Sequence, residues 1–442
     1  MTKRDYRVVA RVEHNEHMAS RKKRPLTLYD VYEVSFEDGS QEVGGAVGKG
    51  LFGNHTTVKS LARTAEDVDD AFLHPVLWHD PDLDALVPFS HYMGLLSQYD
   101  RLLGCLLGCA LGDAIGAPVE AKSKLTCQAY AEDCVLKNDY EGIQRDEHPF
   151  GQVTDDTQCM RIIAQSFDDE GLFSGLDFAE GLANWHMGPG LVGYGENTFL
   201  AIEDYLTSGK PWYECGRPHP ACGNGAAMRA AILGVMDNRY GAIDSFLSLV
   251  EQSCLATHAA PEAILGAQIM AGLARELTKV EEDSFDARRI LNRVLVTLHP
   301  HYGHLDMFHD WLRLSNIFGL PYPKDRKKRY ASKLAFDLQP SGSHWGTGLS
   351  PYVRPSVLWA VYAFLAHPDD FTKSIATAIE CGGDVDTTAA MTGALHGVYN
   401  GTANLDRGLL AQLHDRGTWE LPAYIELARD LIRKLNYTLQ PQ

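Results

Sequence analysis

The chain has 442 residues, 45% hydrophobic and 22% charged, so it is long enough to bury a large core and to hold more than one domain. Its formal net charge of −18 disfavours nucleic acid as a partner, because an acidic protein repels a phosphate backbone. The nine cysteines are scattered and include no CxxC pair, a pattern typical of reduced, core-filling cysteine in a cytosolic protein.

The first 95 residues differ in character from the rest. They lack the apolar region of a signal peptide, and no apolar run in the chain has membrane-spanning length, so we expect a cytoplasmic protein with no membrane partner. Leu28–Phe36 is rich in Val, Tyr and Phe and is followed by a turn sequence and a second short run, which predicts a β-hairpin. The basic cluster Arg21–Arg24 is either a binding surface or a solvated face. We interpret residues 1–95 as a small appended module.

The remainder of the chain is predicted to be helix after helix. The apolar segment Tyr99–Gly116 carries Gly104, Gly108 and Gly112 four residues apart, on one helical face. Because glycine weakens an isolated helix, this pattern favours a fully packed central helix with close neighbours. Glu120 follows the segment and presents a carboxylate.

Two segments share a pattern in which glycine precedes crowded carboxylates and hydroxyls at the start of an apolar helix. They are Thr154–Gln158 and Gly382–Thr387, the second leading into a helix of small residues. One possibility is that these side chains merely cap their helices. A cap requires one side chain, however, and crowded carboxylates repel one another. If the two helix N-termini face each other, they form an oxygen-rich site for two Mg²⁺ or Mn²⁺ ions. The four carboxylates concerned are Asp155, Asp156, Asp384 and Asp386.

Two glycine-rich segments in the middle of the chain have the composition of ligand-binding loops. Gly188–Thr198 allows the backbone to approach a phosphate or sugar closely. Cys222–Arg229 is predicted to open a helix with glycines at its start, a geometry suited to anions. Taken alone, each loop is more often an ordinary connection between helices. The helix start near Pro261 carries His258, and a lone histidine there is more often structural than catalytic. The last forty residues, with a helix over Pro422–Leu435, are expected to be architectural.

The chain after residue 97 resembles the ADP-ribosylglycohydrolase family, which includes the dinitrogenase reductase-activating glycohydrolases. Five segments in the family's order carry this resemblance: Gly104–Ala114, Thr154–Gln158, Gly223–Arg229, Thr257–His258 with Pro261, and Gly382–Thr387. The resemblance implies a compact all-α catalytic domain at 96–442, preceded by a small α+β extension at 1–95. It also implies hydrolysis of the N-glycosidic bond between ADP-ribose and a protein side chain, commonly arginine, at a centre of two Mg²⁺ or Mn²⁺ ions.

The resemblance further assigns roles to individual residues. The implied metal ligands are Thr154, Asp155, Asp156, Asp384, Asp386 and Thr387. The ADP-ribose would lie against Gly193, Tyr194, Gly195, Gly223, Asn224, Gly225 and His258. The base that takes a proton from water as the ribose C1″ gains oxocarbenium character would be Asp155, Asp156 or Glu120. Two positions depart from the family pattern: Glu196 is displaced from an acid that some members carry, and Ala260 stands where many relatives have a polar residue.

Residues 1–95 fall outside this resemblance. A longer chain of this kind is similar to ADP-ribosylglycohydrolase immunity proteins, which protect bacteria from interbacterial ADP-ribosyltransferase toxins such as those of type VI secretion. That similarity implies an ADP-ribosylated protein as substrate and a cognate toxin as a partner of residues 1–95. The alternative to an enzyme is a stoichiometric inhibitor that occludes the toxin's active site through residues 1–95. A third interpretation combines an inert extension with a hydrolase for serine linkages or free ADP-ribosyl metabolites.

Overall fold

The computed structural model describes the backbone of nine segments and, from residue 98 onward, nearly all side chains. These segments are 5–15, 26–35, 41–46, 77–78, 89–145, 148–239, 242–280, 284–341 and 347–436. By their contacts, residues 1–100 and 101–442 form two compact units, and each is described on its own. The predicted basic cluster at Arg21–Arg24 lies outside the described residues. The division into 1–95 and 96–442 stays a prediction.

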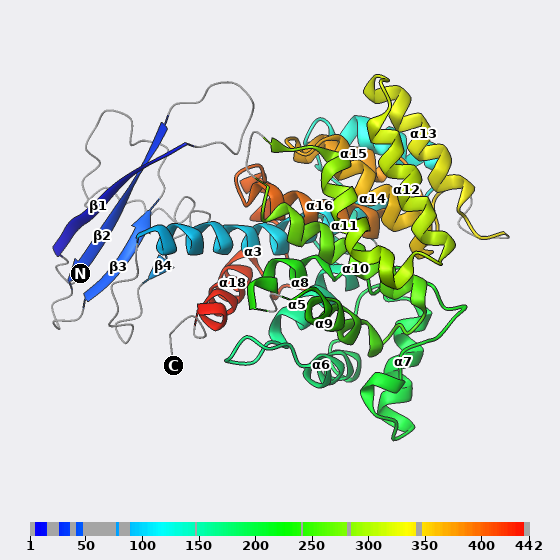
Figure 1. Cartoon of the computed structure of the whole chain (residues 1–442), viewed down its shortest axis with the longest axis horizontal. Coiled ribbons are helices and arrows are strands. Elements are labelled where there is room, and N and C mark those ends of the chain that lie inside the picture. The colour runs from blue at the N-terminus through cyan, green and yellow to red at the C-terminus, as the bar shows by residue number, and fades with distance from the viewer. Residues whose placement is uncertain are drawn as a thin grey trace. The chain divides into compact units, whose positions relative to one another are not determined.

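The first unit contains a four-stranded antiparallel sheet in the order β1-β2-β3-β4, shown in blue in Figure 1. Its strands are β1 (Asp5–Asn15), β2 (Leu26–Ser35), β3 (Gln41–Ala46) and β4 (Leu77–Trp78). The register of β2 against β3 runs from Asp30 opposite Ala46 to Ser35 opposite Gln41. The predicted β-hairpin is therefore confirmed.

The second unit is built from helices, as predicted, with one short antiparallel pair formed by β5 (Gln144–Arg145) and β6 (His148–Pro149) in its described part. The helices are α3 (Phe89–Gly116), α4 (Lys124–Tyr130), α5 (Asp155–Gln165), α6 (Gly175–Met187), α7 (Glu196–Thr207), α8 (Ala231–Val235), α9 (Ile243–Leu255), α10 (Pro261–Leu277), α11 (Ala287–Tyr302), α12 (Asp306–Gly319), α13 (Lys324–Asp337), α14 (Val353–Ala366), α15 (Phe371–Ile379), α16 (Val385–Asn400), α17 (Arg407–Leu410) and α18 (Leu421–Asn436). The all-α class predicted for this region is confirmed.

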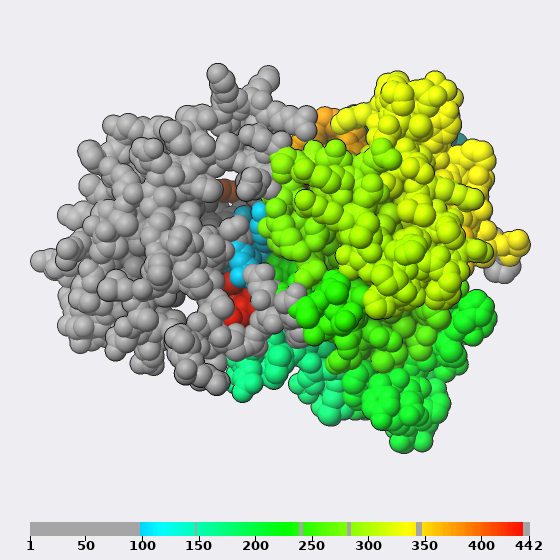
Figure 2. Space-filling view, viewed as in Figure 1, coloured from blue at the N-terminus to red at the C-terminus, as the bar shows by residue number. Residues whose placement is uncertain are grey.

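Helix α16 lies at the centre of the second unit, where all of its residues are buried. Helices α14, α15 and α10 pack around it. In the space-filling view, α11 to α13 form much of the visible face in green to yellow, and little of the orange of α14 to α16 can be seen on this face (Figure 2). Because α16 is surrounded on all sides, its sequence is rich in small and apolar residues rather than amphipathic.

The glycine face predicted for the first helix packs directly against the backbone of α16. A Cβ atom at Gly104 would overlap the carbonyl oxygen of Gly397, and one at Gly108 would overlap that of Gly393. At Gly112 the same overlap would occur with Ala389. Helix α3 has no room for a side chain at these three positions, and α16 has none at Gly393 and Gly397, so the glycines are required by the close approach of the two helices.

This close packing explains why α3 is apolar over so much of its length. The expectation that no apolar run reaches membrane-spanning length was wrong, because Gln98–Val119 is long and apolar enough to cross a membrane by length and composition alone. However, 94% of its most apolar window is buried inside the protein. A core helix of a globular domain has the same properties. We therefore describe α3 as a core helix.

Replacing Gly108 with alanine is expected to destabilise the fold by about 3 kcal/mol, because the added methyl group meets backbone that cannot rotate away. Urea denaturation followed by circular dichroism measures the change in the free energy of unfolding. Gly195→Ala is the matched control, because no atom lies within 4 Å of a Cβ there and its φ of −74° suits alanine. Equal stability of the two variants would contradict the proposed backbone contact.

Candidate active site

The two acidic helix starts predicted from the sequence face each other. Helix α5 begins at Asp155 and α16 begins at Val385. The Thr387 hydroxyl donates to Oδ2 of Asp156 at 3.3 Å, which joins the two N-termini. Neither N-cap residue, Thr154 or Asp384, makes a capping hydrogen bond with its side chain. The alternative that these residues merely cap their helices is therefore wrong.

Asp113, near the end of α3, fixes the start of α5. Its buried carboxylate accepts hydrogen bonds from the backbone N–H and the hydroxyl of Thr154, both at 2.8 Å. It also accepts the hydroxyl of Thr157 at 2.5 Å. The Thr154 hydroxyl lies 3.2 Å from Oδ2 of Asp156 as well. Asp113 thus determines where the first acidic cluster points.

The second acidic helix start meets Glu120. One ligand atom from each of Glu120, Asp384 and Asp386 lies within 4.8 Å of the other two. Arg145 faces this group, with Nη2 at 2.6 Å from Oε2 of Glu120 and Nη1 at 3.6 Å from Oδ2 of Asp386. Backbone hydrogen bonds from Ala121 and to Lys122 hold this segment against Gly383, whose φ of +83° requires glycine.

The clustered carboxylates repel one another strongly. Burial, followed by the charges of neighbouring carboxylates, raises the pKa of Asp155, Asp156 and Asp386 well above the usual range. Burial and Asp386 raise the pKa of Asp384 to about 7. Arg145 offsets only part of this repulsion. Hydrogen bonds within the protein and Arg145 therefore do not balance the negative charge of these carboxylates.

The donor set fits a hard divalent cation. The atoms that converge are carboxylate and hydroxyl oxygens, which Mg²⁺ and similar ions prefer. Oδ1 of Asp156 is buried and has no hydrogen-bond partner among the described residues. A buried acceptor left in this state is costly. A cation bound by the cluster would satisfy this oxygen and relieve the repulsion described above.

The first glycine-rich loop borders the cluster. The backbone N–H of Asp155 donates to the carbonyl of Val192 at 2.8 Å. A Cβ at Gly193 would lie 3.2 Å from Nη2 of Arg145 and 3.7 Å from Oδ1 of Asp155, so this glycine lies directly beside the acids. The Tyr194 hydroxyl pairs with Nδ1 of His186 at 2.9 Å. Gly195, the third residue predicted here, is the N-cap of α7.

The chain near its C-terminal end holds this loop in place. Arg416 donates to the carbonyls of Pro189 at 2.5 Å and Gly190 at 2.6 Å. Gln158 accepts from the Val192 N–H at 2.8 Å and donates to the buried carboxylate of Asp415. The last forty residues, which were expected to be architectural, thus include Asp415 and Arg416, which position the candidate binding loop.

The second glycine-rich segment forms turns, and the prediction that it opens a helix at its glycines was wrong. The Asn224 N–H donates to the carbonyl of Pro351, and Gly223 pairs with Tyr352 in an isolated bridge. This pairing replaces helical bonds, and α8 begins only at Ala231. The Asn224 amide donates to Oδ2 of Asp384 at 2.6 Å. The turn is therefore joined directly to the acidic cluster.

His258 lies against the same turn. A Cβ at Gly225 would lie 2.8 Å from Cε1 of His258, and one at Gly223 would lie 3.4 Å from Nε2. Burial and Arg229 lower the pKa of His258 to about 3, so the ring is neutral. The Thr257 hydroxyl, which accepts from Arg229 at 2.6 Å, lies 2.7 Å from Nδ1.

The structure thus brings together the predicted residues from α5, α16, both glycine-rich segments and the start of α10. Sequence reasoning missed Asp113 and Arg145. Asp113 lies in the segment Gly104–Ala114, which supports the family resemblance without giving this acid a role, and its position just after Gly112 was the available signal. Arg145 lies in a short strand outside any recognisable motif, so no sequence signal identifies it.

Comparison with known proteins agrees with this geometry. A family model described as ADP-ribosylglycohydrolase matches residues 95–438. A solved structure titled "ADP-ribosylglycohydrolase-related protein complex" superposes with a TM-score of 0.53 at 26% identity, covering 76% of this chain and 99% of that chain.

Similar proteins include the ADP-ribosylarginine hydrolase Tri1 of Serratia proteamaculans, 26% identical over 60% of this chain and 63% of Tri1. The ADP-ribosylhydrolase ARH3 of Mus musculus is 27% identical over 56% of this chain and 69% of ARH3. An uncharacterised protein of Archaeoglobus fulgidus is 28% identical over 56% of this chain and 71% of its own length. The family match extends over most of the chain and includes every segment of the site described above. The chain belongs to the ADP-ribosylglycohydrolase family.

Proposed function

We propose that this protein hydrolyses the bond between ADP-ribose and a protein side chain in a metal-dependent reaction. The observation that carries the proposal is the convergence of two acidic helix starts with a turn that is hydrogen-bonded to one of them through Asn224 and Asp384. Family membership and the hydrolase names of Tri1 and ARH3 support the reaction class.

The implied cofactor is a pair of Mg²⁺ or Mn²⁺ ions. The residues that would hold them are Thr154, Asp155, Asp156, Asp384, Asp386 and Thr387. When bound, such ions supply positive charge that orients ribose hydroxyls and makes a nearby water more acidic. The fit rests on the oxygen donors and on the unpartnered Oδ1 of Asp156.

The protein's own groups supply the proton acceptor and the surface for the nucleotide. Glu120, Asp155 and Asp156 are the three candidate bases. Glu120 combines a side chain that is 23% exposed with a pKa raised by burial, which suits a group that accepts a proton from water. As the bond from C1″ to the leaving nitrogen breaks, the water oxygen bonds to C1″ and one water proton passes to the base. The base then releases that proton, and the leaving nitrogen takes it up, so one water is consumed. The neutral His258 ring would lie against the nucleotide.

The proposed linkage is arginine. The support is the similarity to Tri1, whose name specifies ADP-ribosylarginine. Serine-linked ADP-ribose and free ADP-ribosyl metabolites are the alternatives that a substrate comparison separates.

A second proposed function is immunity against an ADP-ribosyltransferase toxin, with residues 1–95 as a stoichiometric blocking module. The supporting observation is that the family match starts at residue 95, while the preceding residues hold a sheet, β1 to β4, that is a unit of its own. The basic residues Arg21–Arg24 would complement an acidic surface on the toxin.

Removing one of the clustered carboxylates is expected to abolish hydrolysis. Asp386→Asn should lower the rate of ADP-ribose release from an arginine-ADP-ribosylated protein on the order of 100-fold, because it removes an oxygen ligand from the cluster. Chelation of divalent cations should have the same effect on the wild type. Asp169→Asn changes an exposed acid and should retain activity. Persistence of the arginine modification, or full activity of Asp386→Asn, would contradict the proposal, and release from serine alone would revise the linkage.

The metal-free protein should lose stability as pH rises. The pKa of Asp384 is 3.8 in its unperturbed state and about 7 in the folded chain, so the folded form favours the proton and stability falls as pH rises through 7. In the presence of a chelator, raising the pH from 6 to 8.5 should lower the free energy of unfolding of the wild type by roughly 1 kcal/mol more than that of Asp384→Asn. Excess Mg²⁺ should abolish this loss, because the cation binds the ionised carboxylate. Urea denaturation at several pH values measures the free energy of unfolding. The same pH dependence in the wild type and in Asp384→Asn would contradict this prediction.

The blocking function predicts inhibition without catalysis. Full-length Asp386→Asn should still inhibit an ADP-ribosyltransferase toxin encoded beside this gene at a ratio of one to one. Reversing the charges of Arg21–Arg24 to glutamate should weaken that inhibition while hydrolysis continues. Inhibition curves at fixed toxin concentration measure both effects. If Asp386→Asn fails to inhibit the toxin, residues 1–95 do not block it.

A further inference from the structure

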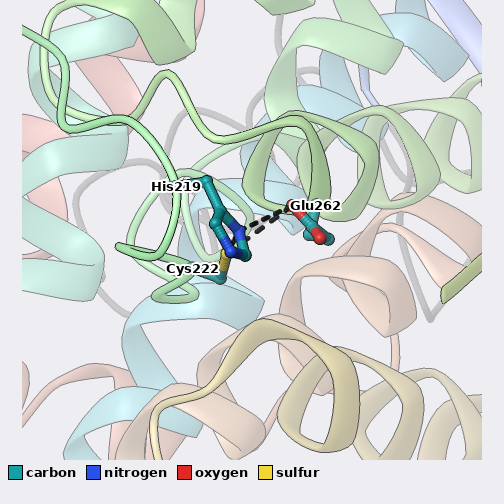
Figure 3. A group of neighbouring side chains, drawn as sticks. All are labelled: His219, Cys222 and Glu262. Carbon is teal, nitrogen blue, oxygen red and sulfur yellow. Dashed lines mark hydrogen bonds and ion pairs between the residues drawn. The ribbon is translucent and has the colours of Figure 1, made fainter. Parts of the chain in front are cut away.

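A second group of potential metal ligands lies outside the carboxylate cluster. It consists of His219, Cys222 and Glu262, whose side chains point toward one another in Figure 3. Two of them come from the loop that precedes the Gly223 turn, and Glu262 stands in the first turn of α10. None of the three was singled out by the family resemblance.

The three ligand atoms form a nearly equilateral triangle. Sγ of Cys222 lies 3.7 Å from Nδ1 of His219 and 3.6 Å from Oε2 of Glu262, and Nδ1 lies 3.8 Å from Oε2. Tetrahedral Zn²⁺ with its usual bond lengths to sulfur, nitrogen and oxygen places such atoms roughly 3.4–3.6 Å apart. A shift of a few tenths of an ångström would therefore bring all three into a coordination shell.

The chemistry of the donors also favours such an ion. Thiolate and imidazole select borderline transition metals over Mg²⁺, which prefers oxygen. The two Sγ contacts are weak hydrogen bonds, and the distance from Nδ1 to Oε2 is too long for one. No other hydrogen bond or ion pair of these three side chains is found among the described residues. Cys222 is buried, whereas the His219 side chain is 67% exposed, so an ion has access from solvent.

We propose that His219, Cys222 and Glu262 bind a divalent transition metal, with Zn²⁺ as the expected ion. Three protein ligands leave the fourth tetrahedral position to water. This site is separate from the carboxylate cluster and does not depend on the proposed hydrolase activity.

A metal at this position would connect the 219–222 loop to the start of α10. Cys222 directly precedes the turn that contains Asn224, and Glu262 follows His258 by four residues. Both segments that contact the candidate nucleotide surface would thus be linked through one ion. The site is a stabilising link between these two segments, rather than a participant in the reaction.

Cobalt binding to the full-length chain tests the proposal. The protein is stripped of metal by a chelator under inert gas, supplied with excess Mg²⁺ to occupy the carboxylate cluster, and titrated with Co²⁺. We expect a thiolate-to-cobalt charge-transfer band that saturates at one equivalent and disappears when Zn²⁺ is added. Carboxylates alone do not produce this band.

Variants assign the ligands. Cys222→Ser should abolish the charge-transfer band, and Glu262→Gln, which keeps the thiol, should weaken Co²⁺ binding at least about tenfold. Cys134→Ser, at a partly exposed cysteine elsewhere, is the matched control and should retain the band. Circular dichroism checks that each variant is folded. Absence of the band in the wild type, or an unchanged band in folded Cys222→Ser, would overturn the proposal.

Discussion

The contact between the backbones of α3 and α16 is the constraint on which the site depends. Gly104, Gly108 and Gly112 allow two buried helices to touch without intervening side chains. The crossing brings the end of α3, with Asp113, beside the start of α16, so the carboxylate that positions α5 sits next to the second acidic motif. If α3 and α16 lay farther apart, the starts of α5 and α16 would also move apart, and their carboxylates would no longer form one cluster.

This rigid packing is what permits so many acids to share one place. Asp155, Asp156 and Asp386 would separate if their backbones could move, because burial and mutual repulsion both disfavour their charged forms. They are held instead by helices whose residues are almost completely buried. The free energy stored in that repulsion is released when positive charge enters, which is a general way to obtain strong cation binding from common side chains.

Local patterns sufficed for the helices, the hairpin and the acidic helix starts. The motif at Gly382–Thr387 is recognisable because glycine, carboxylate and hydroxyl residues occur within six positions. Arg145 and the turn at Asn224 could not be predicted in the same way. Their roles depend on contacts with Glu120 and Asp384, which lie 25 and 160 positions away along the chain. The helix expected at the start of Cys222–Arg229 does not form for the same reason, because pairing with a distant segment replaces the helical hydrogen bonds.

The attachment of the Gly190 loop to Arg416 makes a late segment of the chain part of the candidate site. The floor of that candidate site is built from α3, α5 and α16, whereas this loop is tied by side chains to a segment more than two hundred residues later. Asp415, the neighbour of Arg416, also accepts hydrogen bonds from Gln158 and Arg161 of α5. A change at Asp415 would therefore disturb both the Gly190 loop and the helix whose start carries Asp155 and Asp156.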